Sequence, residues 1–327
     1  MTARGNVVAT VLALSLLAGA CTGNGNPDPT TTSGADASQL GASMASSDLY
    51  AGSPQRVLVG VLQQDQDGVH NVTGGSVRFV FSYLGASGTD PAVEGPTASA
   101  NYVPAPGLPG SPAGTPTPTD PSVSRGTYQA EGVTFDQAGL WEVAVSADIA
   151  GFGQQTLTTQ FQVTDEPLLL APGDQAFATK NLNVHSKGAE PVSIDSRALD
   201  GSPIPDRVLH EWTVADAMRE HRPVLLLVAT PTYCTSQFCG PDTDAVAQLA
   251  QTFGDRAVFI HIEVYKDFNA AADADKFNEA ALQWLEPVGT EPWMWLIGAD
   301  GTIVDRWGPV WDPNEVAQEL AKLPKMK

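Results

Sequence analysis

The spacing of hydrophobic residues divides the chain into two regions. Between residues 50 and 165, apolar residues alternate with polar or small ones, most clearly from Trp141 to Asp148. Alternation with a period of two predicts strands that bury one face. The expected strands are Arg56–Gln63, Ser76–Tyr83, Gly126–Phe135, Trp141–Asp148 and Gln155–Val163. Because no helical period lies between them, they predict an antiparallel β-sandwich as the N-terminal domain.

Two proline-rich segments interrupt the regular patterns. Residues 86–125 contain the sequence GLPGSPAGTPTPTDP and no apolar period, so we expect an irregular insertion between two strands. This insertion is either a plain surface loop or a docking segment for a partner. Residues 166–207 carry several further prolines and are expected to link the N-terminal domain to the next one.

Strand-like and helix-like patterns follow one another over residues 208–327. Thr213 is a predicted N-cap of a short helix, and Asp312 is followed by Pro313 and Glu315, which fit the first turn of a helix. The expected strands are Val224–Val228, Ala257–Tyr265, Glu291–Ile297 and Thr302–Trp307, and the expected longer helices are Pro241–Phe253, a second around Phe277–Leu285 and a third after Asp312. The C-terminal domain is therefore expected to mix strands and helices.

The net charge of the chain limits the classes of partner that it can bind. Its 327 residues include 17 basic and 37 acidic side chains, a formal net charge of −20. A nucleic-acid partner is disfavoured, because phosphate binding requires a basic surface. Anionic lipid head groups repel such a chain, so membrane attachment requires an inserted or covalent anchor. Solubility alone also accounts for the acidic composition.

The N-terminus carries the features of an export signal over residues 1–20. The apolar run Val7–Ala20 is shorter than a membrane-spanning helix needs. It ends in the sequence LAGAC, which resembles a bacterial lipoprotein signal and implies a lipid on Cys21, held at the extracytoplasmic face of a bacterial cell membrane. An ordinary secretory signal is the alternative. Residues 21–49, rich in Gly, Thr, Ser and Ala, are expected to form a flexible tether.

The remaining cysteines, Cys234 and Cys239, form a pair between a predicted strand and a predicted helix. Outside the cytosol such a pair tends to oxidise, so an internal disulfide is expected. The free N–H groups and positive dipole end of a helix N-terminus favour thiolate over thiol, which is how a cysteine becomes reactive. A purely structural disulfide that ties the turn is the alternative.

The cysteine pair, the following Pro292 at the start of a strand, and the Asp300-Gly301 turn together resemble the thioredoxin-like superfamily, in particular membrane-anchored thiol–disulfide proteins of bacteria. Four residues separate the cysteines here, whereas the usual motif has two. The resemblance implies a cis peptide bond between Glu291 and Pro292 and thiol–disulfide exchange with exported protein thiols or disulfides, without a cofactor.

The segment Thr134–Val143 is also similar to hairpins of small secreted immunoglobulin-like modules. The expected fold class is therefore an α/β thioredoxin-like C-terminal domain over residues 208–327 and an all-β immunoglobulin-like sandwich over residues 50–165.

Roles within the candidate site follow from position. Cys234 is the predicted nucleophile and Cys239 the resolving cysteine. Glu263 is the nearest acid that we nominate as a proton relay, unless it is a surface carboxylate. His261 lies on the same strand face, where it is either a structural residue or, with both cysteines, a Cu(I) ligand. Copper delivery and a non-catalytic binding module are thus the alternative functions.

Overall fold

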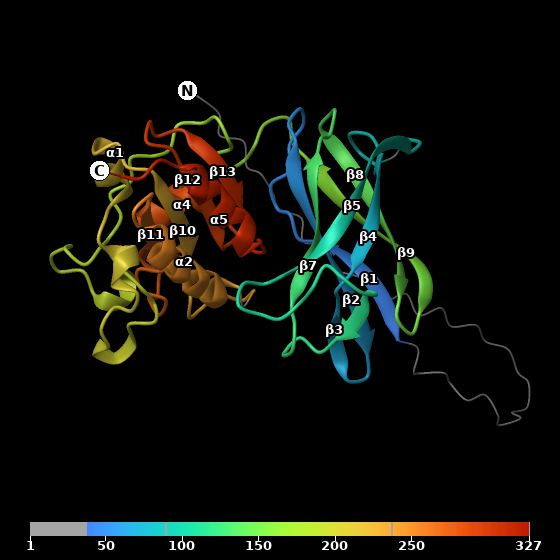
Figure 1. Ribbon diagram of the computed structural model, residues 1–327, viewed down its shortest axis with the longest axis horizontal. Coiled ribbons are helices and arrows are strands. Elements are labelled where there is room, and N and C mark those ends of the chain that lie inside the picture. The colour runs from blue at the N-terminus through green and yellow to red at the C-terminus, as the bar shows by residue number, and fades with distance from the viewer. Residues whose placement is uncertain (1–37, 89, 237, 327) are drawn as a thin grey trace, which may run out of the picture. The chain divides into compact units, whose positions relative to one another are not determined.

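The structure is a computed structural model that describes residues 38–326, apart from residues 89 and 237. Nine strands form one antiparallel sheet, in the order β6-β3-β2-β7-β5-β4-β8-β9, and β1 pairs with β2 beside this path (Figure 1). These strands are β1 (Gln39–Met44), β2 (Gln55–Asp65), β3 (Gly68–Thr73), β4 (Ser76–Tyr83), β5 (Val93–Pro104), β6 (Thr117–Thr119), β7 (Gly126–Val133), β8 (Gly139–Ile149) and β9 (Gly153–Val163).

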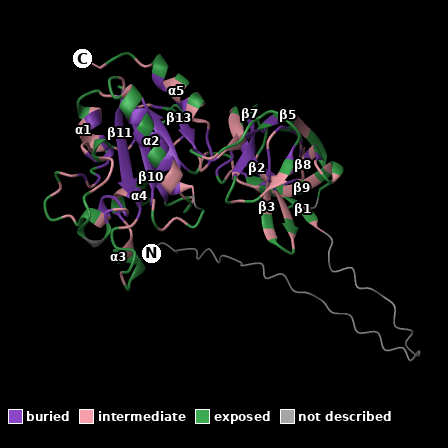
Figure 2. Ribbon diagram, turned by 60° about the horizontal axis from the view of Figure 1, so that its bottom comes forward, coloured by how far each residue is buried: buried purple, intermediate pink, exposed green. Residues whose placement is uncertain are grey.

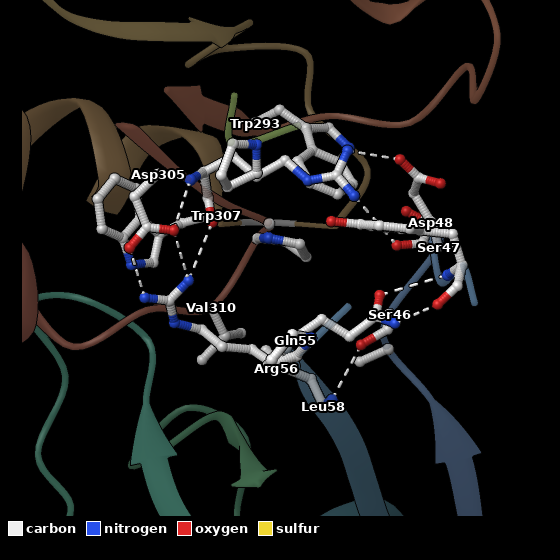
Figure 3. A pocket seen from close by; sticks show the side chains of 17 residues that line it. Ser46, Ser47, Asp48, Gln55, Arg56, Leu58, Trp293, Asp305, Trp307 and Val310 are labelled. Atoms are coloured by element: carbon white, nitrogen blue, oxygen red, sulfur yellow. Dashed lines mark hydrogen bonds and ion pairs between the residues drawn. The ribbon is translucent and has the colours of Figure 1, made fainter. Parts of the chain in front are cut away.

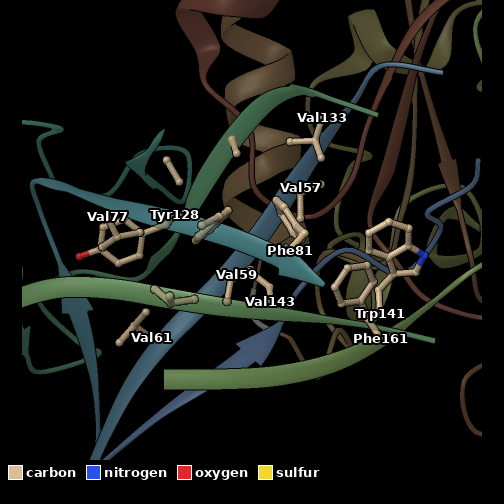
Figure 4. Packing of buried hydrophobic residues seen from close by; sticks show 14 of the residues in the cluster. Val57, Val59, Val61, Val77, Phe81, Tyr128, Val133, Trp141, Val143 and Phe161 are labelled. Carbon is tan, nitrogen blue, oxygen red and sulfur yellow. The ribbon is translucent and has the colours of Figure 1, made fainter. Parts of the chain in front are cut away.

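The sheet curls around its own hydrophobic core. Residues of β8 alternate between buried and partly exposed positions, as the period-two pattern predicts. Val57, Phe81, Trp141 and Phe161 come from four different strands and meet in this core (Figure 4). Phe135 packs edge-on against Trp141, with ring centroids 4.9 Å apart. Aromatic contacts of this kind add to the free energy gained from burial.

The second sheet has four strands in the order β11-β10-β12-β13. The strands β10 and β11 run parallel, and the other two pairs are antiparallel. The strands are β10 (Val224–Ala229), β11 (Val258–Glu263), β12 (Trp293–Ile297) and β13 (Ile303–Trp307). All six residues of β10 and of β11 are buried, as Figure 2 shows by their colour.

Short helices cover both faces of this second sheet. Side chains of α1 and α4 pack with Leu226 and Val228 of β10, whereas side chains of α2 and α5 pack with Leu225 and Leu227 on the opposite face. The helices are α1 (Val214–Arg219), α2 (Cys239–Phe253), α3 (Asp273–Lys276), α4 (Glu279–Leu285) and α5 (Pro313–Lys322). Three 3₁₀ turns precede them, η1 (Pro191–Ser193), η2 (Leu199–Gly201) and η3 (Arg207–His210).

The expected fold class, an α/β thioredoxin-like C-terminal domain with an immunoglobulin-like sandwich, is wrong. The protein is mostly β, with 37% strand against 18% helix, and a thioredoxin-like α/β pattern is not evident. In place of two face-to-face sheets, the N-terminal region has one curled sheet, because β7 pairs with both β2 and β5 and so joins all the strands. The second sheet is small, and α3 and α4 have only four and seven residues.

Several local predictions are confirmed. Thr213 caps α1 by accepting a hydrogen bond from Asp216 N, and Asp312 caps α5 by accepting one from Asn314 N. The bond between Glu291 and Pro292 is cis. By contrast, the prediction that residues 86–125 form an irregular insertion is wrong in part, because this segment contains β5 and β6.

Most of the predictions for the N-terminus concern residues that the structure does not describe. The signal peptide over 1–20 and the lipidated Cys21 lie outside the described residues and stay predictions. Residues 39–44 of the predicted tether form β1. Within the described part of the chain, no helix has both the length and the apolar character that crossing a membrane requires.

Candidate functional site

The two cysteines form a disulfide where β10 leads into α2. The strand ends at Ala229, a loop carries Cys234, and Cys239 is the first residue of α2. The Cα atoms of the two cysteines are 6.0 Å apart, within the range that a disulfide requires. The predicted pairing of Cys234 with Cys239 is therefore confirmed.

The two sulfurs of this disulfide have unequal environments. Cys239 is 0% exposed and packs among the side chains of α2, β10 and α5. Cys234 is only partly buried at the edge of the same core, and its Sγ lies 3.0 Å from the exposed Ser236 hydroxyl. Of the two cysteines, Cys234 is thus the one that solvent reaches in part, whereas Cys239 is enclosed by packing.

Asp242 lies one helical turn after Cys239 and is fully buried. Residues three apart on a helix are neighbours, with Cβ atoms about 5–6 Å apart. Burial raises the pKa of Asp242 well above its usual range, opposed only by the nearby Trp311 indole. Neither oxygen of Asp242 nor Trp311 Nε1 makes a hydrogen bond of ordinary geometry among the described residues. Burial therefore favours the protonated form of the Asp242 carboxyl, one helical turn from the buried cysteine.

Glu263 and Pro292 lie at the end of the sheet from which the cysteine loop leaves. Glu263 pairs with Ala229, the last residue of β10. Trp293, which follows Pro292, pairs with Val228 on the other side of β10. The register thus brings Glu263, Pro292 and the start of the cysteine loop to one edge.

The carboxyl group of Glu263 is already occupied by backbone donors. Its Oε2 accepts from Ser196 N at 2.7 Å and its Oε1 from Tyr265 N at 3.2 Å. Burial raises the pKa of Glu263, opposed by the charge of His261 and by hydrogen bonds from Thr230 and Ser196. These contacts position the segment around Ser196, and a proton-relay role for Glu263 stays a prediction.

A second carboxyl at this edge belongs to Glu291. Burial raises its pKa to about 8, with the Glu263 charge adding to the shift and the Thr230 backbone opposing it. Its Oε2 is shielded from solvent and has no hydrogen-bond partner among the described residues. Glu291 is therefore a partly buried acid with a pKa of about 8, next to the cis bond to Pro292.

Aromatic side chains form a surface beside Cys234. Tyr233, the preceding residue, stacks on Phe268 with ring centroids 4.0 Å apart and planes 7° apart. Phe268 is 41% exposed and also meets the edge of Tyr265. A pocket lined by these three residues and by Leu199 opens next to the accessible cysteine. Such a surface suits an apolar side chain near a substrate cysteine.

His261 lies in a different cluster from the one expected. Its ring is buried, with Nε2 3.0 Å from Ala229 O and Nδ1 3.8 Å from Asp195 Oδ2. His210 Nε2 lies 3.2 Å from the same oxygen. Among the described residues, Asp195, His210 and His261 are the one set of three potential metal ligands within 4.8 Å of one another. The cysteines do not join this set, and copper binding by Cys234, Cys239 and His261 stays a prediction.

A separate pocket lies where β2 meets β13 (Figure 3). Arg56 contacts both Asp305 and Glu315, and its guanidinium lies 5.2 Å from the Trp307 ring centroid. Arg306 Nη1 donates to Asp48 Oδ2 at 2.6 Å, in a pair whose side chains are 8% and 0% exposed. Because these charges are paired within the protein, they join the two sheets.

The sequence did not reveal four of the buried or partly buried ionisable residues that lie near the cysteines or beside His261. Asp242 reads as an ordinary acid of a first helical turn, and Glu291 as a residue before a proline. Asp195 and His210 lie in a segment without periodicity. One signal was available: acid and histidine residues that flank apolar runs are candidates for burial.

Comparison of the chain with protein-family models, with curated proteins and with solved structures finds no match.

Proposed function

We propose that the protein is a thiol–disulfide oxidoreductase that acts through Cys234 and Cys239 on the thiols or disulfides of exported proteins. The observation that carries this proposal is the unequal burial of the two cysteines, with Cys239 fully buried and Cys234 only partly buried. A disulfide that serves only to tie a turn needs no such difference. A redox pair needs one sulfur that meets the substrate and one that resolves the intermediate.

The exchange can be written from these positions. In the oxidising direction, a substrate thiolate attacks Cys234 Sγ, the bond between the two cysteines breaks, and Cys239 leaves as a thiolate. A second substrate thiolate then attacks the substrate sulfur of the mixed disulfide and displaces Cys234. The substrate loses two electrons and gains a disulfide, and the protein becomes a dithiol. The reducing direction runs through the same steps in reverse.

Asp242 and the helix end stabilise the leaving group in this scheme. The first N–H groups of α2 and the helix dipole favour negative charge on Cys239. An ionised carboxylate at Asp242 would repel that charge, and burial keeps the carboxyl neutral instead. The neutral acid then supplies a proton to the Cys239 thiolate as it forms.

The setting proposed for this activity is the extracytoplasmic face of a bacterial membrane, with the chain anchored through lipid on Cys21. Oxidising compartments support a resting disulfide such as the one between Cys234 and Cys239. The aromatic surface of Tyr233, Tyr265 and Phe268 supports substrates that carry an apolar residue near the reacting cysteine.

Trapping of the mixed disulfide tests the proposal. The full-length, reduced Cys239→Ser variant should form a stable mixed disulfide with a one-cysteine peptide supplied as its disulfide-linked dimer, because Cys234 displaces one peptide thiol and neither Cys239 nor a second cysteine of the bound peptide can release the adduct. The Cys234→Ser variant should form little adduct, since Cys239 is buried, and Ser236→Ala should behave as the wild type. Equal trapping by both cysteine variants, or by neither, would contradict the proposal.

A further inference from the structure

Three buried side chains from separate segments converge on one point. Asp195 follows η1, His210 ends η3, and His261 lies within β11. The side chains of all three are 0% exposed. Neither the disulfide chemistry nor the hydrophobic core requires two imidazoles and a carboxylate at this place. Burial of three such polar groups together is costly unless each is paired.

The hydrogen bonds of His261 fix which of its nitrogens carries the proton. Ala229 O, 3.0 Å from Nε2, can only accept, so Nε2 must carry the hydrogen. In the neutral ring, Nδ1 is then an acceptor. It lies 3.8 Å from Asp195 Oδ2, which is also an acceptor, and it has no hydrogen-bond partner among the described residues. The conflict is that His261 Nδ1 is a buried acceptor without a donor in the described part of the chain, whereas Asp195 Oδ2 accepts from Arg197 Nη2 and lies 3.2 Å from His210 Nε2.

A proton on Nδ1 is a poor solution to this conflict. A separation of 3.8 Å is too long for a hydrogen bond between nitrogen and oxygen. A cation seated between the two atoms resolves the conflict, because both then act as ligands. The bond from Nε2 to a backbone carbonyl is the arrangement that commonly orients a metal-bound histidine.

The surrounding charges favour a divalent cation. Arg197 contacts Asp195, Asp206 and Asp244, and only the first of these carboxylates is fully shielded. Three carboxylates and one guanidinium leave two negative charges around the cluster. Arg197 Nε donates to Oδ1 of Asp195 at 3.0 Å and Nη2 to Oδ2 at 2.8 Å. Oδ1 also accepts from Arg197 N at 2.9 Å, so the lone pair that a cation can take is the one of Oδ2 that faces His210 Nε2.

We propose that Asp195 Oδ2, His210 Nε2 and His261 Nδ1 bind one Zn²⁺ ion. Zinc bonds to nitrogen and oxygen of about 2.0–2.2 Å place tetrahedral ligands roughly 3.3 Å apart. The distances from Oδ2 to the two imidazole nitrogens, 3.2 and 3.8 Å, lie on either side of this value. Two imidazoles and one carboxylate are donors that suit zinc. Since the cluster is sealed from solvent, the ion ties the segment from η1 to η3 onto β11.

Metal analysis of the full chain tests this site. Protein stripped with a chelator and dialysed against Zn²⁺ should retain one ion per chain and show a melting temperature higher than the stripped form. The His261→Ala and Asp195→Asn variants should bind Zn²⁺ at least about tenfold more weakly. His70→Ala, which alters a histidine of β3 paired with Asp65, should bind as the wild type does.

Two further measurements distinguish loss of this site from misfolding of a variant and from metal binding by the cysteine thiols. Co²⁺ added to the stripped wild type should give visible absorption that Zn²⁺ abolishes. A variant with both Cys234→Ser and Cys239→Ser should keep the ion, which separates this site from the redox pair. Wild-type protein that retains no Zn²⁺ and melts at an unchanged temperature would overturn the proposal. So would equal losses from His70→Ala and His261→Ala.

Discussion

The two sheets treat ionisable side chains in opposite ways. In strands β1 to β9, as far as the structure describes them, no Asp, Glu, His, Lys or Arg side chain is buried, and the core is hydrophobic. The region around the second sheet buries Asp195, His210, Asp242, His261 and Glu263. Burial of ionisable groups lowers stability and is concentrated where chemistry occurs. This difference supports the proposal that the first sheet stabilises the fold and that the end of the second takes part in the chemistry.

Removal of the largest side chain from the first core should affect stability alone. Trp141 is 1% exposed, and Trp141→Ala should lower the free energy of unfolding by about 3–5 kcal/mol through lost burial and a cavity. Urea denaturation measures this loss, with Val93→Ala at an exposed position as the control. The rate of thiol–disulfide exchange should stay unchanged in the folded variant. A slower exchange would show that the first sheet takes part in the chemistry.

Loss of the neutral acid beside Cys239 should affect the reaction more than the fold. Asp242→Asn keeps the shape of the side chain but cannot transfer a proton to the Cys239 thiolate. We expect exchange with a two-cysteine peptide to slow by about 10- to 100-fold at neutral pH. Asp255→Asn, at an exposed carboxyl beyond the other end of α2, should exchange at the wild-type rate. An unchanged rate for Asp242→Asn would remove this residue from the mechanism.

Glu291 should make stability depend on pH. Its folded pKa of about 8 lies above the ordinary value of 4.5, so the folded state binds an extra proton between these values. Stability from this group is complete below its unfolded pKa and is lost as pH rises, by up to about 1.4 kcal/mol per pH unit. Urea denaturation from about pH 5 to pH 8 should show a shallower decline for Glu291→Gln. Glu94→Gln, an exposed control, should show the pH dependence of the wild type. A Glu291→Gln variant whose unfolding free energy falls with pH as steeply as that of the wild type would contradict this prediction.

Local signals in the sequence predicted individual elements, although the predicted fold class is wrong. The alternation around Trp141 predicted β8, the caps Thr213 and Asp312 marked helix starts, and the cysteine count predicted the disulfide. Each of these depends on residues close together in the chain. In β5 the burial pattern is mostly exposed or intermediate. Its strand structure comes from pairing with β4 and β7, which a pattern of apolar residues does not reveal.

The candidate site was predicted only in part, for a related reason. The positions of Cys234 and Cys239 at a strand end and helix start follow from the sequence around them. The burial of Asp242 instead depends on packing of α2 against Trp311 and α5. The meeting of Asp195 with His261 joins segments 66 residues apart, as 261 minus 195 gives. Contacts of that kind arise only once the chain has folded.

The most direct test of the account compares the two sulfurs in the reduced full chain. Brief treatment with iodoacetamide, followed by mass spectrometry of the peptides, measures the alkylation rate of each cysteine. The account predicts that Cys234 reacts at least about tenfold faster than Cys239, because thiolate character and access both govern the rate. Equal rates, or faster labelling of Cys239, would contradict the claim that one sulfur meets the substrate while the other stays buried behind it.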